Sequence, residues 1–163
     1  AKALHELVEV GLIDRAPTRI HAAQAAGCAP VATAIQQRTD VITPVRPNSI
    51  AKSLAIGNPA DGRYASRAVQ SSGGWGTACR EDAVTEAMTL LAETEGILSE
   101  PAGGVVLAGL QQLIQQGRIR REESVVICIT GNGLKTTELF SVDQGRSVHL
   151  GRAKASEFEK VMV

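Results

Sequence analysis

Hydrophobic and polar positions follow two different spacings along most of this chain. Apolar residues at intervals of three and four predict amphipathic helices, whereas short unbroken apolar runs predict buried strands. Helical spacing covers residues 2–12, 30–38, 61–70, 81–94 and 101–117, and a shorter helix is expected to end near residue 54. Strands are expected at 20–26, 75–78 and 125–129.

The run from Val125 to Ile129 ends in a glycine-rich loop and is the most strand-like of these segments. All five of its residues are apolar, which suits a strand covered on both faces, because a half-exposed strand would alternate. We therefore predict a central strand of a mainly parallel sheet, next to residues 20–26, with Cys128 buried inside it. At its carboxyl end, Thr130 supplies a hydroxyl and Gly131 allows close backbone approach, where α/β folds place ligands. An ordinary Asn-Gly turn fits the same pattern.

Composition favours an α/β fold over a sandwich. Hydrophobic residues make up 44% of the 163 residues, which is enough for a core, but the chain has one Trp, one Tyr and two Phe. The core must therefore be built from Ala, Val, Leu and Ile, as is usual where helices pack closely on a sheet. In the 101–117 helix, Gly104 and Gly109 each weaken the helix by about 1 kcal/mol relative to Ala, so we expect another backbone to approach closely there.

Charge and cysteine usage exclude several classes of function. Seventeen basic and seventeen acidic residues cancel and are scattered, so the sequence carries no footprint of a nucleic-acid or lipid-binding protein. No apolar stretch has the length of a membrane span and no signal peptide is evident, so a cytoplasmic protein is expected, although a transit peptide could have been removed. The three widely spaced cysteines argue against a disulfide framework and against a metal site.

Several polar and aromatic residues have a structural and a functional interpretation. His21 and Gln24 lie in a predicted core strand, where satisfying neighbouring polar groups is the favoured role. In the 61–70 helix, Tyr64 and Val69 are predicted to face inward. A basic cluster at Arg118, Arg120 and Arg121 is interpreted as a solvated helix terminus rather than as a phosphate site.

Four stretches, in the same order, resemble the threonine synthase family. Ile56-Gly-Asn-Pro59 is similar to that family's Ile-Gly-Asn-Pro segment, and Glu95-Gly-Ile-Leu-Ser-Glu-Pro-Ala102 is similar to its Glu-Gly-(x)3-Glu-Pro-Ala segment. Thr130-Gly-Asn-Gly-Leu-Lys135 resembles its Thr-Gly-His/Asn-Gly-Leu-Lys signature. Upstream, the segments Gly11-Leu-Ile, Pro17-Thr-Arg and Gln24-Ala-Ala-Gly-Cys-Ala-Pro30 also match. After Pro59, however, Ala60-Asp-Gly stands where the family more often has an aromatic residue.

This resemblance implies a fold, a cofactor and a set of site residues. The family binds pyridoxal 5'-phosphate in a three-layer αβα fold with an open, mainly parallel twisted sheet. Residues 1–138 would be the C-terminal part of its large domain, followed by a partly helical tail at 139–163. Thr130 matches the hydroxyl partner of the pyridine nitrogen, and Gly131, Asn132 and Glu100 would line the cofactor side of the cleft. A neutral hydroxyl does not stabilise a protonated ring, so the ring would be a moderated electron sink.

The resemblance also implies that no catalytic residue lies in this chain. The family's Schiff-base lysine and its glycine-rich phosphate loop precede the part that this chain matches. Lys135 lies on the same short loop as Thr130, and one loop cannot easily serve both the nitrogen of the ring and its far side. Lys52 has no supporting motif.

The implied function is conversion of O-phosphohomoserine and water to threonine and phosphate by the full-length protein. The chain alone would be inactive, and its expected partners are a small amino-acid substrate, a missing N-terminal half and a second copy in a homodimer. Two alternatives remain open. One is another pyridoxal-phosphate enzyme of the eliminating or β-replacing kind, such as a threonine dehydratase or a cysteine-synthase-like protein, and the other is a non-catalytic structural or association module.

Overall fold

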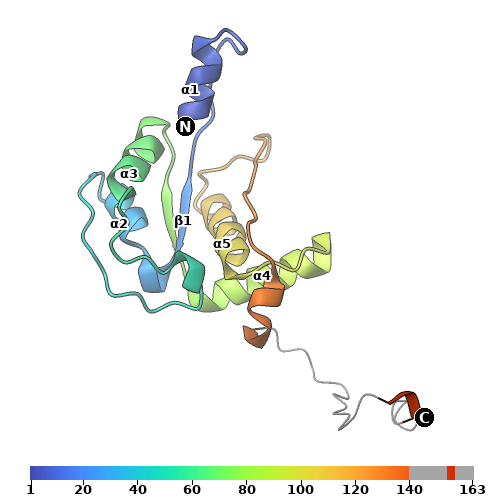
Figure 1. Cartoon of the computed structure of the whole chain (residues 1–163). Helices are drawn as coiled ribbons and strands as arrows, with labels where there is room; N and C mark the ends of the chain where they lie inside the picture. The colour runs from blue at the N-terminus through green and yellow to red at the C-terminus, as the bar shows by residue number, and fades with distance from the viewer. Residues whose placement is uncertain (140–153, 157–163) are drawn as a thin grey trace.

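Two short parallel strands lie between helices in a computed structural model that describes residues 1–139 and 154–156 (Figure 1). Strand β1 (Ala22–Ala25) pairs with β2 (Gly76–Cys79), with Ala22 opposite Gly76 and Ala25 opposite Cys79. On one face lie α2 (Pro30–Gln36) and α3 (Gly62–Ser71). On the other lies α5 (Pro101–Gln115), with α4 (Glu81–Glu95) packed against it. The chain therefore has the expected three-layer α/β fold with a parallel sheet.

Within residues 1–139 the other elements are one projecting helix and four short 3-10 turns. Helix α1 (Lys2–Glu9) extends away from the layered body (Figure 1). The turns are η1 (Ala26–Cys28), η2 (Lys52–Leu54), η3 (Gly133–Lys135) and η4 (Thr137–Leu139). No helix in the described part of the chain is long and apolar enough to cross a membrane. The predicted tail at 139–163 lies outside the described residues, apart from 139 and 154–156.

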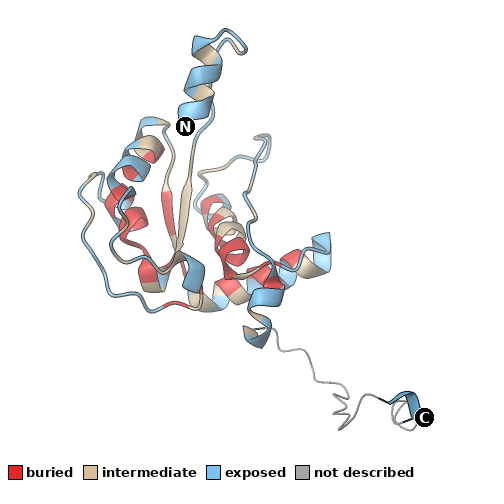
Figure 2. Ribbon diagram, in the orientation of Figure 1, coloured by how far each residue is buried: buried red, intermediate tan, exposed pale blue. Residues whose placement is uncertain are grey.

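The core consists of two apolar clusters, one on each face of the strand pair, which Figure 2 shows as buried residues. Between the strands, α4 and α5 the buried residues are small or medium in size: Ala25, Ala51, Cys79, Val84, Ala87, Met88, Val105 and Ala108. On the opposite face Val31, Ile35 and Val69 are buried, with Trp75 packed against them. The predicted core of small aliphatic residues is confirmed, and it lets the helices approach the strands closely.

Helix α5 makes these close approaches at its glycines. A Cβ on Gly104 would lie 2.5 Å from the Val84 carbonyl oxygen of α4. A Cβ on Gly109 would lie 2.6 Å from the Ala23 Cβ of β1 and 2.9 Å from the Thr77 hydroxyl of β2. The expected close approach at both glycines is therefore confirmed, and the packing offsets their low helix propensity.

His21 and Gln24 pair with neighbouring polar groups, as expected. The side-chain oxygen of Gln24 accepts hydrogen bonds from the backbone N–H groups of Val31 and Ala32, both at 2.9 Å. These are free donors of the first turn of α2, so a residue of β1 caps the helix that follows it. His21 Nδ1 accepts a hydrogen bond from the backbone N–H of Trp75 at 3.2 Å. This bond extends the contact between the two strands beyond their amino ends.

The predicted central strand at 125–129 is wrong. The segment belongs to neither strand of the sheet, Val126 is 89% exposed, and Cys128 is exposed rather than buried. It runs on the far side of α5 from β1 (Figure 1), so the helix separates its backbone from both strands. An apolar run predicts burial against a partner, but it does not identify that partner.

Two helical faces also differ from prediction. Tyr64 is 68% exposed, because Gly62, Ser66 and Val69 form the buried face of α3 instead. The Ser66 hydroxyl donates to the Thr39 carbonyl at 2.8 Å, which explains how a polar residue replaces the aromatic one inside. No residue of α1 is buried, so its predicted apolar face is not covered by the described part of the chain.

The close contact at Gly104 can be tested by substitution. Gly104→Ala should lower the free energy of unfolding by about 1–2 kcal/mol, because the overlap with α4 outweighs the gain of roughly 1 kcal/mol in helix propensity. Denaturant unfolding would measure the change. The matched control is Gln115→Ala on the exposed end of α5, which should stay within about 0.5 kcal/mol of wild type. A Gly104→Ala protein more stable than wild type would contradict the packing argument.

Exposed apolar surface at Val125 and Val126 should drive association of the isolated chain. Light scattering at rising concentration should show a mass above that of a monomer, and Val126→Lys should reduce it. Ser124→Lys adds the same charge at a neighbouring polar position and should leave association nearly unchanged. A wild-type chain that stays monomeric and binds no dye specific for apolar surface would disprove this expectation.

Candidate functional site

The carboxyl ends of the two strands and the amino terminus of α5 lie at the same edge of the fold. Helix α5 runs antiparallel to the strands, since Arg118, just after its end, contacts Arg19 and Trp75, which precede β1 and β2. Its N-cap residue Glu100 is therefore at the opposite edge, beyond the carboxyl ends of the strands. This edge is where open α/β sheets bind ligands.

Glu81 ties the loops of this edge together. It is the first residue of α4, separated from β2 by Arg80, and its carboxylate accepts hydrogen bonds from three groups. These donors are the Gly27 N–H at 3.2 Å, the Ser49 hydroxyl at 3.1 Å and the Ile50 N–H at 3.0 Å. Charge-assisted bonds of this kind are stronger than neutral ones, so Glu81 fixes the turn after β1 and the 48–50 loop relative to each other.

The loop that carries the predicted site packs on the segment before α5. The Gly133 N–H donates to the Leu98 carbonyl at 2.9 Å, and Asn132 forms an isolated antiparallel bridge with Ser99. Gly131 has a φ of +78°, and a Cβ there would overlap the Glu100 Oε1 atom. Only glycine fits this position, because it must accept both a left-handed conformation and the Glu100 side chain.

The structure thus brings together Gly131, Asn132 and Glu100 from segments about 30 residues apart in sequence. The sequence predicts that Gly131 lets a ligand approach the backbone closely. In the structure, the Glu100 carboxylate occupies the space where a Cβ of residue 131 would lie. The Asn132 side chain accepts from the Leu134 N–H at 2.9 Å and so caps η3. Its role in this structure is to hold the shape of the loop.

Thr130 is the predicted residue that is open to a bound molecule. Its side chain is exposed, as are those of Lys52 and Lys135. An exposed hydroxyl beside a fixed glycine turn is able to donate or accept one hydrogen bond to a bound molecule. The described residues of this edge offer no comparable arrangement around either lysine.

Two contributors to the site were missed by sequence reasoning. Glu81 is one of them, because its three loop contacts join residues distant in sequence and depend on tertiary structure. Ser53, in η2, donates to Glu100 Oε1 at 3.4 Å. Through Ser49 and Ser53 the hydroxyl-rich 49–53 segment links Glu81 to the Glu100 side of the site, and its spacing carried no signal for this.

Sequence comparison identifies a family and several relatives of this chain. The family of pyridoxal-phosphate-dependent enzymes matches residues 1–131. Threonine synthase of Methanocaldococcus jannaschii is 39% identical over 135 residues, which are 82% of this chain and 33% of that protein. Threonine synthase of Mycobacterium tuberculosis is 38% identical over 135 residues, 82% of this chain and 35% of that protein. The chain spans about a third of the length of these curated relatives.

Solved structures show the same fold at low sequence identity. A threonine deaminase from T.th. superposes with a TM-score of 0.51 at 14% identity and covers 71% of this chain and 39% of that one. Serine racemase from Dictyostelium discoideum gives a TM-score of 0.50 at 17% identity, with 72% of this chain and 35% of that one covered. With a family match over most of its length and the motif residues gathered at one edge, this chain belongs to the family of pyridoxal-phosphate-dependent enzymes.

Proposed function

We propose that this chain forms the C-terminal part of a threonine synthase, which converts O-phosphohomoserine and water to threonine and phosphate. The similarity to threonine synthases over 82% of the chain carries the proposal. The contact between Gly131 and Glu100 supports it, because two of the matched motifs meet there at the ligand-binding edge. Another eliminating or β-replacing enzyme of the same family is the alternative. Reaction rates of the full-length protein with O-phosphohomoserine, threonine and O-acetylserine as substrates would distinguish the two enzymes.

When bound, pyridoxal phosphate would supply the electron sink for proton loss next to the amino group of the substrate. Thr130 would donate or accept one neutral hydrogen bond at the ring nitrogen. A hydroxyl, unlike a carboxylate, adds no charge there, so the strength of the sink stays moderate. Gly131, Asn132 and Glu100 would position Thr130, since they fix the turn that follows it. The residues that move protons at the substrate would lie outside this chain.

A substitution at Thr130 tests this assignment in the complete enzyme. Thr130→Val should lower kcat/KM by about threefold to tenfold, the equivalent of one neutral hydrogen bond of roughly 1 kcal/mol. The exposed position makes a stability change above about 0.5 kcal/mol unexpected. Thr137→Val, also exposed, is the matched control and should leave activity unchanged. Equal effects of the two variants, or a loss of stability without a loss of activity, would remove Thr130 from the site.

The proposed absence of the cofactor lysine is tested with the chain itself. After incubation with pyridoxal phosphate and reduction with borohydride, the 163-residue chain should carry scattered substoichiometric adducts only, because Lys52 and Lys135 are exposed side chains without a surrounding site. Intact mass and peptide mapping measure this. Lys135→Gln should leave the adduct yield almost unchanged. A single stoichiometric adduct at Lys135 or Lys52 that survives dialysis would place the catalytic lysine in this chain.

A further inference from the structure

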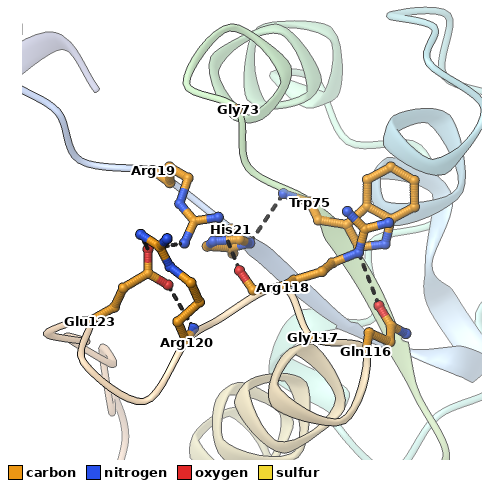
Figure 3. A pocket seen from close by; sticks show the side chains of 9 residues that line it. All are labelled: Arg19, His21, Gly73, Trp75, Gln116, Gly117, Arg118, Arg120 and Glu123. Atoms are coloured by element: carbon orange, nitrogen blue, oxygen red, sulfur yellow. Dashed lines mark hydrogen bonds and ion pairs between the residues drawn. The ribbon is translucent and has the colours of Figure 1, made fainter.

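A cavity of about 690 Å³, whose lining residues are drawn in Figure 3, lies at the edge of the fold that carries the amino ends of the strands, opposite the Thr130 loop. His21 and Trp75 line it just before β1 and β2, and Gln116 to Arg118 line it just after α5. Its remaining wall includes Arg19, Gly73, Arg120 and Glu123. The 15 residues of α5 separate it from Glu100 by roughly 22 Å at 1.5 Å per residue. It is therefore distinct from the candidate cofactor site.

The wall of this cavity carries an excess of positive charge. Three arginines face one carboxylate, that of Glu123. Burial, followed by the neighbouring charges of Arg19 and Arg118, lowers the pKa of His21, so the imidazole is neutral near pH 7. Nδ1 of His21 accepts a hydrogen bond from the backbone N–H of Trp75, so the proton of the neutral ring is on Nε2. This Nε2–H group adds an uncharged hydrogen-bond donor.

Arg118 is held in place without a carboxylate partner among the described residues. Its guanidinium lies 3.6 Å from the centroid of the Trp75 ring, and its Nε donates to the Gln116 side-chain oxygen at 3.3 Å. Stacking and one neutral hydrogen bond orient the group but leave its charge uncompensated. A planar guanidinium fixed in this way is suited to bidentate recognition of an oxyanion.

The contacts of Glu123 show that neighbouring hydrogen-bond donors bind an oxyanion. The Glu123 carboxylate accepts a hydrogen bond from the Arg19 side chain and another from the backbone N–H of Arg120 at 2.8 Å. The Arg120 N–H is the largest cause that lowers the pKa of Glu123, and the Arg19 charge adds to it. Glu123 thus compensates Arg19, and Glu122, whose carboxylate lies 3.2 Å from the Arg120 side chain, compensates Arg120. Arg118 retains its charge.

The end of α5 does not cancel this positive charge. A helix C-terminus carries about half a negative charge, which is smaller than the one full charge of Arg118 that no carboxylate among the described residues compensates. Two of its last carbonyls are also occupied, since the backbone N–H groups of Gly117 and Arg118 donate to the carbonyls of Ile114 and Leu113, both at 2.9 Å. The net field in the cavity therefore favours an anion.

We propose that this cavity binds a phosphate group, either as inorganic phosphate or as part of a small phosphorylated molecule. Arg118, which the sequence alone predicts as part of a solvated helix terminus, provides the stacked, uncompensated guanidinium. Arg120 at the rim, paired with Glu122, provides a second guanidinium. The proposal is independent of the reaction proposed above, because it rests only on the cavity between the amino ends of the strands and the C-terminus of α5.

The fluorescence of Trp75 offers a direct test, since it is the only tryptophan of the 163-residue chain and touches Arg118. Inorganic phosphate, adenosine monophosphate and adenosine are titrated separately at constant ionic strength, with chloride as the balancing anion. Saturable changes with phosphate or the monophosphate, and none with adenosine, are expected. Tighter binding of the monophosphate than of phosphate indicates a phosphorylated molecule, and equal binding indicates free phosphate. A response to adenosine equal to that of its monophosphate, or no saturation with either phosphate compound, would overturn the proposal.

Three arginine variants locate the binding site. Arg118→Gln should weaken phosphate binding by about tenfold or more, because it removes an uncompensated charge-assisted contact. Arg120→Gln should weaken it by about threefold to fivefold, because the Arg120 charge is already paired with Glu122. Arg121→Gln removes the same charge one residue away from the cavity wall and should change affinity less than about twofold. Circular dichroism checks folding, and exposed Arg120 can be replaced without disturbing the Trp75 stack. Equal weakening by all three variants would mean nonspecific attraction and would disprove the site.

Discussion

The close packing of α5 against both strands and α4 is the constraint on which the rest of this structure depends. Gly104 and Gly109 bring the helix within contact of α4 and of the strand pair, where any side chain would overlap. The packing sets the direction and height of α5 relative to the strands. It thereby determines which edge of the fold receives Glu100 and which receives Arg118.

The two ends of α5 consequently serve different chemistry. At the amino end, glycine-rich backbone and hydroxyl side chains surround Glu100, and Glu81 holds the loops that reach this edge. At the carboxyl end, arginines gather around Trp75. A single rigid helix fixes the separation of these regions, so binding at one end would not need to disturb the other.

Polar side chains in this fold act as ties between elements. Gln24 of β1 caps α2, Glu81 of α4 binds two loops, and Ser66 of α3 holds the Thr39 carbonyl. Buried or half-buried polar groups must form hydrogen bonds. Each such bond fixes the relative position of two segments, and it does so more specifically than contacts between small aliphatic side chains. This explains how a chain with few aromatic residues obtains defined loops at its binding edge.

The sequence by itself predicted every helix of the layered body and both paired strands, because these have regular spacing, a proline in the first turn or a glycine at the end. It also indicated the close approach at Gly104 and Gly109, since unfavourable helix residues need a packing reason. Motif resemblance selected Thr130, Gly131, Asn132 and Glu100, and three of these four meet in the structure.

The packing partners of the apolar segments and the long-range contacts between polar groups depended on the tertiary structure. The 125–129 run has the composition of a buried strand, but α5 lies between it and the sheet, so Val125, Val126 and Cys128 remain exposed. The triple contact of Glu81 and the stacking of Arg118 on Trp75 join residues far apart in sequence. Local patterns specify local backbone conformation and burial preference, whereas these contacts depend on how rigid elements are placed in space.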